Sequence, residues 1–123
     1  MGNEFLFWNS IKLIKAYKSK LISPVEVVRE SVKNAKKFNY RFNFITEYLE
    51  DSALEKAKIS EDAYLGKGSY SPRLLEGIPL AVKDEFALSG TFRTSGSKIY
   101  KHRKDNFTDI YVSRLIDGGS IPI

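Results

Sequence analysis

Lys83 is the residue whose position most suggests chemistry. The apolar residues 78–82 read as a buried strand, and they are followed directly by an ammonium and a carboxylate, Lys83 and Asp84. We expect the Lys83 side chain to leave the edge of a core, where a lysine loses hydration and its pKa is easily lowered. A lysine with a lowered pKa can act as a general base. The alternative is an inert lysine at a strand end, paired with Asp84 or Glu85.

The stretch after Lys83 is long and lacks a clear period. Residues 85–103 are rich in glycine and hydroxyl residues, and a loop of this length in a compact domain is usually functional or poorly ordered. Residues 91–97 could offer N–H groups to an anion, but they lack the P-loop spacing and its Gly-Lys-Ser/Thr ending. We therefore expect no phosphate site there. His102, the single histidine, stands among basic residues and is expected to be exposed and without function.

Composition narrows the class of protein. The chain has 123 residues, 42% hydrophobic and 28% charged, which fits one globular domain. It contains no cysteine, so disulfides, thiolate nucleophiles and cysteine zinc sites are excluded. The net charge of +5 fits either solvated helix faces or a nucleic-acid surface. We expect no metal and no cofactor.

The first elements are expected to be helical. Residues 7–21 place Phe7, Ile11, Ile14, Tyr17 and Leu21 near helical spacing, with lysines on the other side. This helix either packs on its own domain or touches a membrane or a partner. We expect a cytoplasmic protein, with peripheral membrane association as the alternative.

A second helix has a clear start. Ser23, Pro24 and Glu26 form a capping-box pattern, and an apolar stripe continues to Ala35 before the helix fades near residues 38–39. Residues 42–48 then predict a strand, although aromatic residues beside Arg41 could also stack on bases. Another helix begins at Asp51, with Ala53, Leu54, Ala57 and Tyr64 on one face, and residues 66–72 form a loop.

The last third of the chain predicts a parallel sheet. Thr108 can cap a helix that contains Val112, Leu115 and Ile116 and ends at Gly118-Gly119. A new apolar strand begins at Ser120. The order strand, loop, helix, strand is typical of a βαβ unit and so of an α/β fold. Because an apolar strand is an unusual place for a chain to stop, we expect the chain to be a fragment.

Several of these stretches resemble the amidase signature family. Gly-Ile-Pro-Leu-Ala-Val-Lys-Asp at 77–84 is followed by Arg-Thr-Ser-Gly-Ser at 93–97, a helix at 109–117 and Gly-Gly-Ser-Ile-Pro at 118–122. Residues 22–27 and 43–46 also fit. The likeness runs over nearly the whole chain but over only the first part of a family member. Residues 82–86 and 119–122 look closer to the fatty acid amide hydrolase branch, with the glutamyl-tRNA amidotransferase A subunit as the main alternative.

The resemblance implies a mixed sheet flanked by helices, with residues 1–40 as peripheral helices and 41–123 as the first strands and helices of the core. It also implies a Ser–cis-Ser–Lys mechanism in which Lys83 is the general base. The bridging serine, the nucleophile and the oxyanion-hole glycines lie further along the family's chain. No serine here stands in a Gly-Ser-Ser-Gly-Gly context, so no nucleophile is assigned; the serines considered are Ser89, Ser95, Ser97, Ser113 and Ser120.

These points lead to three expectations about function. The first is an amidase-type hydrolase of carboxylic acid amides, present as an N-terminal fragment that is inactive alone, with a small-molecule or lipid amide as the substrate of the full-length parent. The second is a fragment of a glutamyl-tRNA amidotransferase A subunit. The third is a non-catalytic basic module that binds a partner or nucleic acid, or a degenerate product with no function. We also expect the isolated chain to be marginally stable or prone to aggregate.

Overall fold

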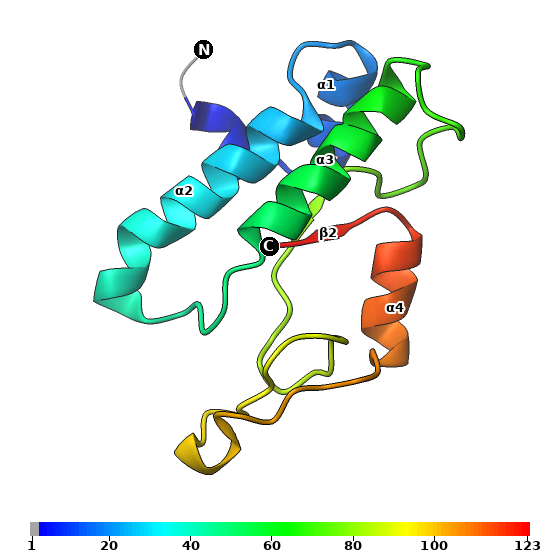
Figure 1. Ribbon diagram of the computed structural model, residues 1–123. Helices are drawn as coiled ribbons and strands as arrows, with labels where there is room; N and C mark the ends of the chain where they lie inside the picture. The colour runs from blue at the N-terminus through cyan, green and yellow to red at the C-terminus, as the bar shows by residue number, and fades with distance from the viewer. Residues whose placement is uncertain (1–2) are drawn as a thin grey trace.

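The computed structural model describes residues 3–123 (Figure 1). Its helices are the 3-10 helix η1 (Asn3–Phe7), α1 (Ser10–Lys18), α2 (Pro24–Phe42), α3 (Glu50–Tyr64), the 3-10 helix η2 (Lys98–Tyr100) and α4 (Ile110–Asp117), and its strands are β1 (Pro79–Leu80) and β2 (Ile121–Pro122). No helix within residues 3–123 is long and apolar enough to span a bilayer.

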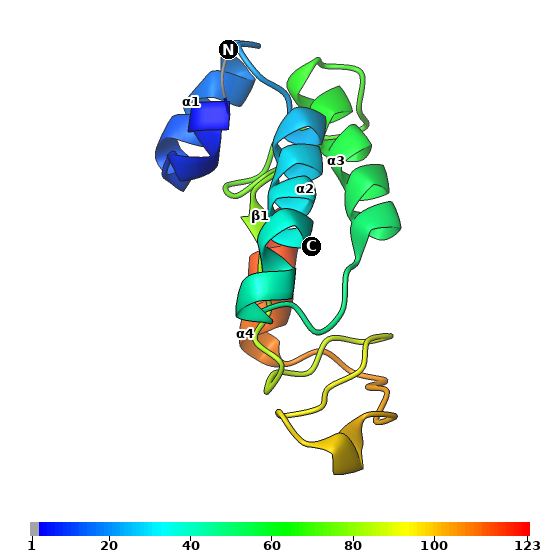
Figure 2. The same ribbon diagram turned by 90° about the vertical axis from the view of Figure 1, so that its left-hand side faces the viewer.

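The helices α2 and α3 lie side by side and form the main body of the chain (Figures 1 and 2). The capping box that starts α2 is present: Glu26 N donates to Ser23 Oγ, and Ser23 N donates to Glu26 Oε2 at 2.8 Å. Val25 and Val28 on α2 pack with Ala53 and Ala57 on α3. Ala53 and Ala57 are both buried, so the face that their spacing predicted is the face that packs on α2.

The strand expected at residues 42–48 is wrong. The helix α2 runs past residues 38–39 to Phe42 and ends at Asn43, whose φ of 47° lies in the left-handed region. Asn39 Oδ1 accepts hydrogen bonds from the N–H groups of Phe44 and Ile45, both at 2.8 Å. The chain therefore turns into a loop, because one asparagine side chain takes the bonds that a strand partner would otherwise receive.

The prediction of a single helix at residues 7–21 is also wrong, both in the length of the helix and in most of the residues expected on its buried face. The 3-10 helix η1 ends at Phe7, and α1 begins at Ser10, capped by Asn9, whose side chain accepts from Lys12 N. The buried residues of α1 are Leu13, Ala16 and Tyr17. Of the expected stripe, Tyr17 is buried, whereas Phe7, Ile11 and Leu21 are exposed.

The predicted βαβ unit is confirmed in its topology. The strands β1 and β2 pair in parallel, with Pro79 opposite Ile121, and α4 lies between them in sequence. Ile121 N donates to Ile78 O at 2.8 Å, and Ile123 N donates to Leu80 O at 3.1 Å. The ladder is shorter than the strand expected at 78–82, because the paired residues are Pro79 with Ile121 and Leu80 with Pro122.

Candidate active site

Lys83 lies three residues beyond the end of β1 and is exposed. Its side chain is 71% accessible, and its Nζ donates to Glu85 Oε1 at 2.7 Å. The expectation that Lys83 leaves the edge of a core is therefore wrong for residues 3–123, because no other segment of these residues covers it. The partner is one of the two carboxylates named in the alternative reading. The role of Lys83 as a general base stays a prediction.

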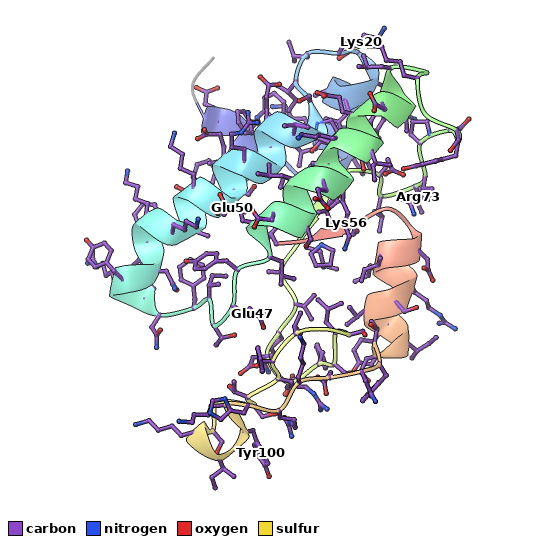
Figure 3. The ribbon with its side chains drawn as sticks, viewed as in Figure 1. Lys20, Glu47, Glu50, Lys56, Arg73 and Tyr100 are labelled. Atoms are coloured by element: carbon purple, nitrogen blue, oxygen red, sulfur yellow. The ribbon has the colours of Figure 1, made fainter. Side chains whose placement is uncertain are left out.

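Lys83 and Asp84 line a cleft of about 450 Å³. One wall is the loop between α2 and α3, including Phe44 and Glu47, and the other is formed by Val82 and Ile123 at the ends of the sheet. Glu47, labelled in Figure 3, also accepts a hydrogen bond from Phe92 N at 2.8 Å and so ties this loop to residues 85–105. The lysine therefore stands beside a hollow of the size that small ligands occupy.

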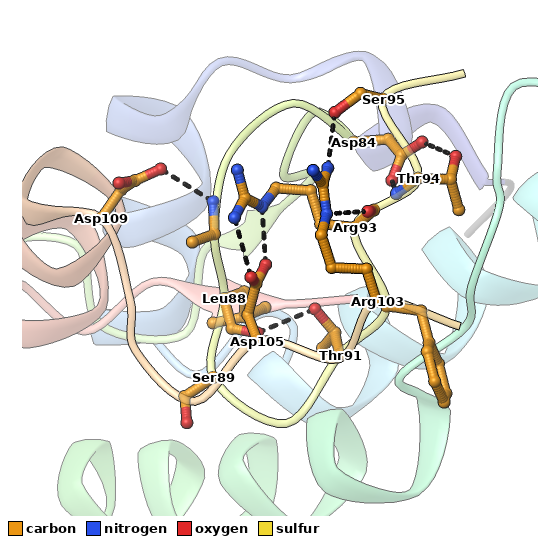
Figure 4. A network of polar contacts seen from close by, with 12 residues as sticks. Asp84, Leu88, Ser89, Thr91, Arg93, Thr94, Ser95, Arg103, Asp105 and Asp109 are labelled. Carbon is orange, nitrogen blue, oxygen red and sulfur yellow. Dashed lines mark hydrogen bonds and ion pairs between the residues drawn. The ribbon is translucent and has the colours of Figure 1, made fainter. Parts of the chain in front are cut away.

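Asp84 holds a tight turn beside the lysine (Figure 4). Its carboxylate accepts from Thr94 N at 2.7 Å, from Thr94 Oγ1 and from Gly96 N at 3.3 Å, and its carbonyl accepts from Ser95 N. Burial alone would raise the pKa of Asp84, but the hydrogen bonds from Thr94 and Gly96 lower it below its ordinary value. Asp84 therefore stays ionised and fixes the turn next to Lys83.

A second set of polar contacts orders the rest of the long loop (Figure 4). Arg93 makes two hydrogen bonds to Asp105, at 2.7 and 2.8 Å, and this guanidinium lowers the pKa of Asp105. Arg103 donates to Arg93 O at 2.9 Å and to Ser95 Oγ at 2.8 Å. The loop predicted to be functional or poorly ordered is thus held in place by these side chains, together with an antiparallel bridge between Phe92 and Lys104.

The structure does not bring a serine to Lys83. Within residues 3–123, no serine hydroxyl hydrogen-bonds its ammonium: Ser95 Oγ accepts from Arg103, and Ser97 Oγ accepts from Ile99 N. His102 is exposed, as expected. Over the same residues, no cluster of histidine, aspartate and glutamate could hold a metal ion.

Glu76, which the sequence alone did not single out, is a fully buried carboxylate three residues before β1. It accepts hydrogen bonds from Arg73 Nε at 2.7 Å, from Tyr70 at 3.2 Å and from Ser60. Burial would raise the pKa of Glu76, but the hydrogen bonds from Arg73 and Ser60 outweigh it and lower the pKa. The signal in the sequence was a glutamate between Leu75 and a Gly-Ile-Pro turn, three residues after an arginine.

Two tyrosines, the buried Tyr17 and the partly buried Tyr64, hold the backbone of residues 76–77. Tyr64 donates to the carbonyl of Glu76 at 3.0 Å, and Tyr17 donates to the carbonyl of Gly77 at 3.1 Å. Burial and, to a smaller extent, the charge of Glu76 raise the pKa of Tyr64 to about 12. Burial also raises the pKa of Tyr17. Both hydroxyls therefore remain protonated donors and fix the backbone that leads into β1.

Comparison with known proteins gives a consistent result. The family model described as Amidase matches residues 26–123. The glutamyl-tRNA(Gln) amidotransferase A subunit of Brachyspira hyodysenteriae is 34% identical over 116 residues, which cover 92% of this chain and 23% of that protein. The mitochondrial protein of the same name from Rattus norvegicus is 36% identical over 106 residues, which cover 86% of this chain and 20% of that protein. The chain thus spans about a fifth to a quarter of the length of these relatives.

Solved structures agree on the fold. A bacterial aryl acylamidase of the amidase signature enzyme family superposes with a TM-score of 0.82 at 23% identity, over 94% of this chain and 24% of that one. A second structure is that of an inhibitor-bound vestigial protein complex, described in connection with the evolutionary origins of an s-triazine catabolic enzyme. It superposes with a TM-score of 0.84 at 22% identity, over 94% of this chain and 25% of that one. The arrangement of helices around β1 and β2 is therefore that of the N-terminal part of such enzymes.

Proposed function

Because this chain belongs to the amidase family, we propose that it supplies the general base, Lys83, of an enzyme that cleaves carboxylic acid amides. The observation that carries the proposal is the position of the Lys83-Asp84 pair. It lies inside the matched region, a few residues after β1, and it lines the cleft at the end of that strand. The ordered turn at Thr94, bonded to Asp84, gives the lysine a fixed neighbour.

In the proposed reaction, neutral Lys83 accepts a proton from a bridging serine, which in turn takes the proton of a nucleophilic serine. The nucleophile attacks the amide carbonyl, the proton held by Lys83 passes back through the bridging serine to the leaving nitrogen, the C–N bond breaks, and an acyl-enzyme remains. Water then releases a carboxylic acid. In the family both serines lie further along the chain, and these 123 residues contain no Gly-Ser-Ser-Gly-Gly segment. Lys83 Nζ must turn from Glu85 toward the bridging serine, which an exposed lysine can do by a rotamer change.

A second candidate is the amidotransferase reaction, in which ammonia released from one amide is passed to another acceptor. The observation that favours it is the identity of 34% and 36% to glutamyl-tRNA(Gln) amidotransferase A subunits. This support is stronger than the short motif that suggested the fatty acid amide hydrolase branch. The base, the bridging serine and the nucleophile have the same roles in both candidates.

The proposal is tested with a chimera in which this chain replaces the matching N-terminal segment of the Brachyspira hyodysenteriae relative. The chimera should be labelled by a serine-directed fluorophosphonate probe, and the isolated 123 residues should not, because the chain alone has a base and no nucleophile. Lys83→Ala should reduce labelling and amide hydrolysis by roughly a thousandfold or more, as loss of one member of a catalytic unit does.

The matched control is Lys104→Gln, which removes an exposed lysine outside the cleft and should leave labelling unchanged. Gel filtration and circular dichroism of each chimera check that it folds. A folded Lys83→Ala chimera that reacts as fast as its parent would rule out Lys83 as the base. Labelling of the isolated chain would show that it has a nucleophile of its own.

A further inference from the structure

A basic tip protrudes from the body of the molecule at residues 98–104. Figure 1 shows η2 at the far end of the chain fold from α1, beyond the last turn of the other helices, and Figure 2 shows the same separation. The sequence of this tip is Lys-Ile-Tyr-Lys-His-Arg-Lys, with four cationic side chains and no carboxylate. It is the densest run of positive charge in the chain.

Most of this charge is free to meet a partner. Lys98, Lys101 and Lys104 are exposed, and no ion pair within residues 3–123 involves any of the three. The nearby acidic residues are already engaged, because Asp105 pairs with Arg93 and Asp84 binds Thr94 and Gly96. A cation without an internal partner adds electrostatic attraction to any anionic surface.

The tip also presents apolar groups outward. Ile99 is 87% exposed and Tyr100 is 44% exposed. Tyr100 lies against the Arg103 guanidinium, 4.3 Å from the ring centre. An exposed isoleucine, a tyrosine next to it in the sequence and lysines on both sides match the chemistry of a bilayer interface, where tyrosine prefers the headgroup level and lysines meet anionic lipids.

The tip is held in one shape. Tyr100 N and Lys101 N donate to Ser97 O and Lys98 O, Phe92 and Lys104 form an antiparallel bridge, and Arg103 donates to Ser95 Oγ and Arg93 O. Little conformational entropy is therefore lost when the tip contacts a partner. Proteins that bind single-stranded nucleic acid usually hold it in a basic groove. A protruding tip is instead suited to a flat surface.

We propose that residues 98–104 dock the protein on an anionic lipid bilayer, with Ile99 inserted among the headgroups and the three lysines facing anionic lipids. This role does not depend on whether Lys83 acts as a base. Each lysine should contribute roughly fivefold to binding, so the three together contribute on the order of a hundredfold. Loss of Ile99 should reduce binding roughly tenfold.

The test is flotation of the 123-residue chain with phosphatidylcholine vesicles that do or do not contain phosphatidylserine; flotation separates bound protein from aggregates, which sink. The wild-type chain should float only with phosphatidylserine. Vesicle binding should fall on the order of a hundredfold in the variant Lys98→Gln/Lys101→Gln/Lys104→Gln. It should fall roughly tenfold in the variant Ile99→Ser. All three lysine side chains and Ile99 are exposed, so circular dichroism should show an unchanged fold.

The matched control is Lys12→Gln/Lys15→Gln/Lys18→Gln on α1, which removes the same charge at the opposite end of the molecule. It should keep most of the flotation, and equal loss in both triple variants would overturn the proposal in favour of a general charge effect. Titration with a labelled oligonucleotide completes the test. If wild-type chain binds the oligonucleotide and not the vesicles, and the tip variant loses that binding, the proposal is wrong and the tip is a nucleic-acid surface.

Discussion

At the scale of single residues, Glu76 is the side chain on which the region before Lys83 depends. A buried carboxylate is costly unless it is fully hydrogen-bonded, and Glu76 has Arg73, Ser60 and Tyr70 as donors. Its charge is therefore compensated inside the protein. Every partner lies on α3 or on the loop before β1, so the carboxylate joins a helix to the strand that ends near Lys83.

We predict that Glu76→Gln destabilises the chain by about 2–4 kcal/mol, because the amide leaves the Arg73 charge without its partner and presents N–H groups to the donors around it. The free energy of unfolding is measured by urea titration, with fluorescence as the signal. Glu55→Gln, at an exposed position of α3, is the control and should stay within about 0.5 kcal/mol of the parent. Equal effects of the two substitutions would show that the buried network contributes nothing.

The same residue makes stability depend on pH. Because the pKa of Glu76 is lower in the folded state, its contribution is full above the pKa of an unfolded glutamate, about 4.3, and is lost as the pH falls through the folded pKa. Asp84 and Asp105 have lowered pKa values and act in the same direction. The fall in stability below this pH should therefore be smaller in Glu76→Gln than in the parent, but it should not vanish.

At the scale of elements, a close approach of two turns brings β1 and β2 together. Gly119 has a φ of 104°, and a Cβ atom there would lie 2.7 Å from the Glu76 Cα. Gly77 N donates to Gly119 O at 3.0 Å across the same contact. The glycine after α4 is thus required both by its backbone angle and by the neighbouring backbone, and it sets the parallel register of the sheet.

Gly119→Ala should destabilise the chain by roughly 2–5 kcal/mol and weaken the β1–β2 pairing. The measurement is amide hydrogen exchange at Ile121, whose N–H is bonded to Ile78 O. Gly90→Ala is the matched control, because Gly90 has a similar φ of 87° but open space around it. It should cost only about 1 kcal/mol. Protection at Ile121 that is the same in both variants would refute the steric argument.

How far the sequence predicted these elements depends on which interactions formed them. The α2 start and the βαβ order were predictable, since Ser23, Glu26 and the Gly118-Gly119 pair act locally. The prediction of a strand at residues 42–48 is wrong, because the conformation of these residues depends on Asn39, which lies outside them. The exposure of Lys83 was missed for a similar reason: an apolar strand is buried only if later segments cover it, and burial is not a local property.

At the scale of the whole molecule, residues 3–123 leave much apolar surface uncovered. The sheet has two strands, each with an unpaired edge, and exposed aromatic and aliphatic side chains gather on and before α4; they are Phe107, Ile110, Tyr111 and Leu115. Further large apolar side chains are exposed at the end of α2 and in the loop after it; they are Phe38, Phe42 and Phe44. In relatives four to five times as long, the additional chain is available to cover such surfaces.

We therefore predict that the isolated 123-residue chain melts over a broad temperature range and self-associates as its concentration rises, because exposed apolar patches and open strand edges both favour association. Analytical ultracentrifugation across a concentration series measures this directly. Ile110→Lys, which places a charge in the patch on α4, should raise the monomer fraction, whereas Lys58→Arg on the exposed side of α3 should not. A sharp, cooperative melt of a monomer in the parent chain would contradict the prediction, since it would mean that α2, α3 and the short sheet suffice as a folding unit.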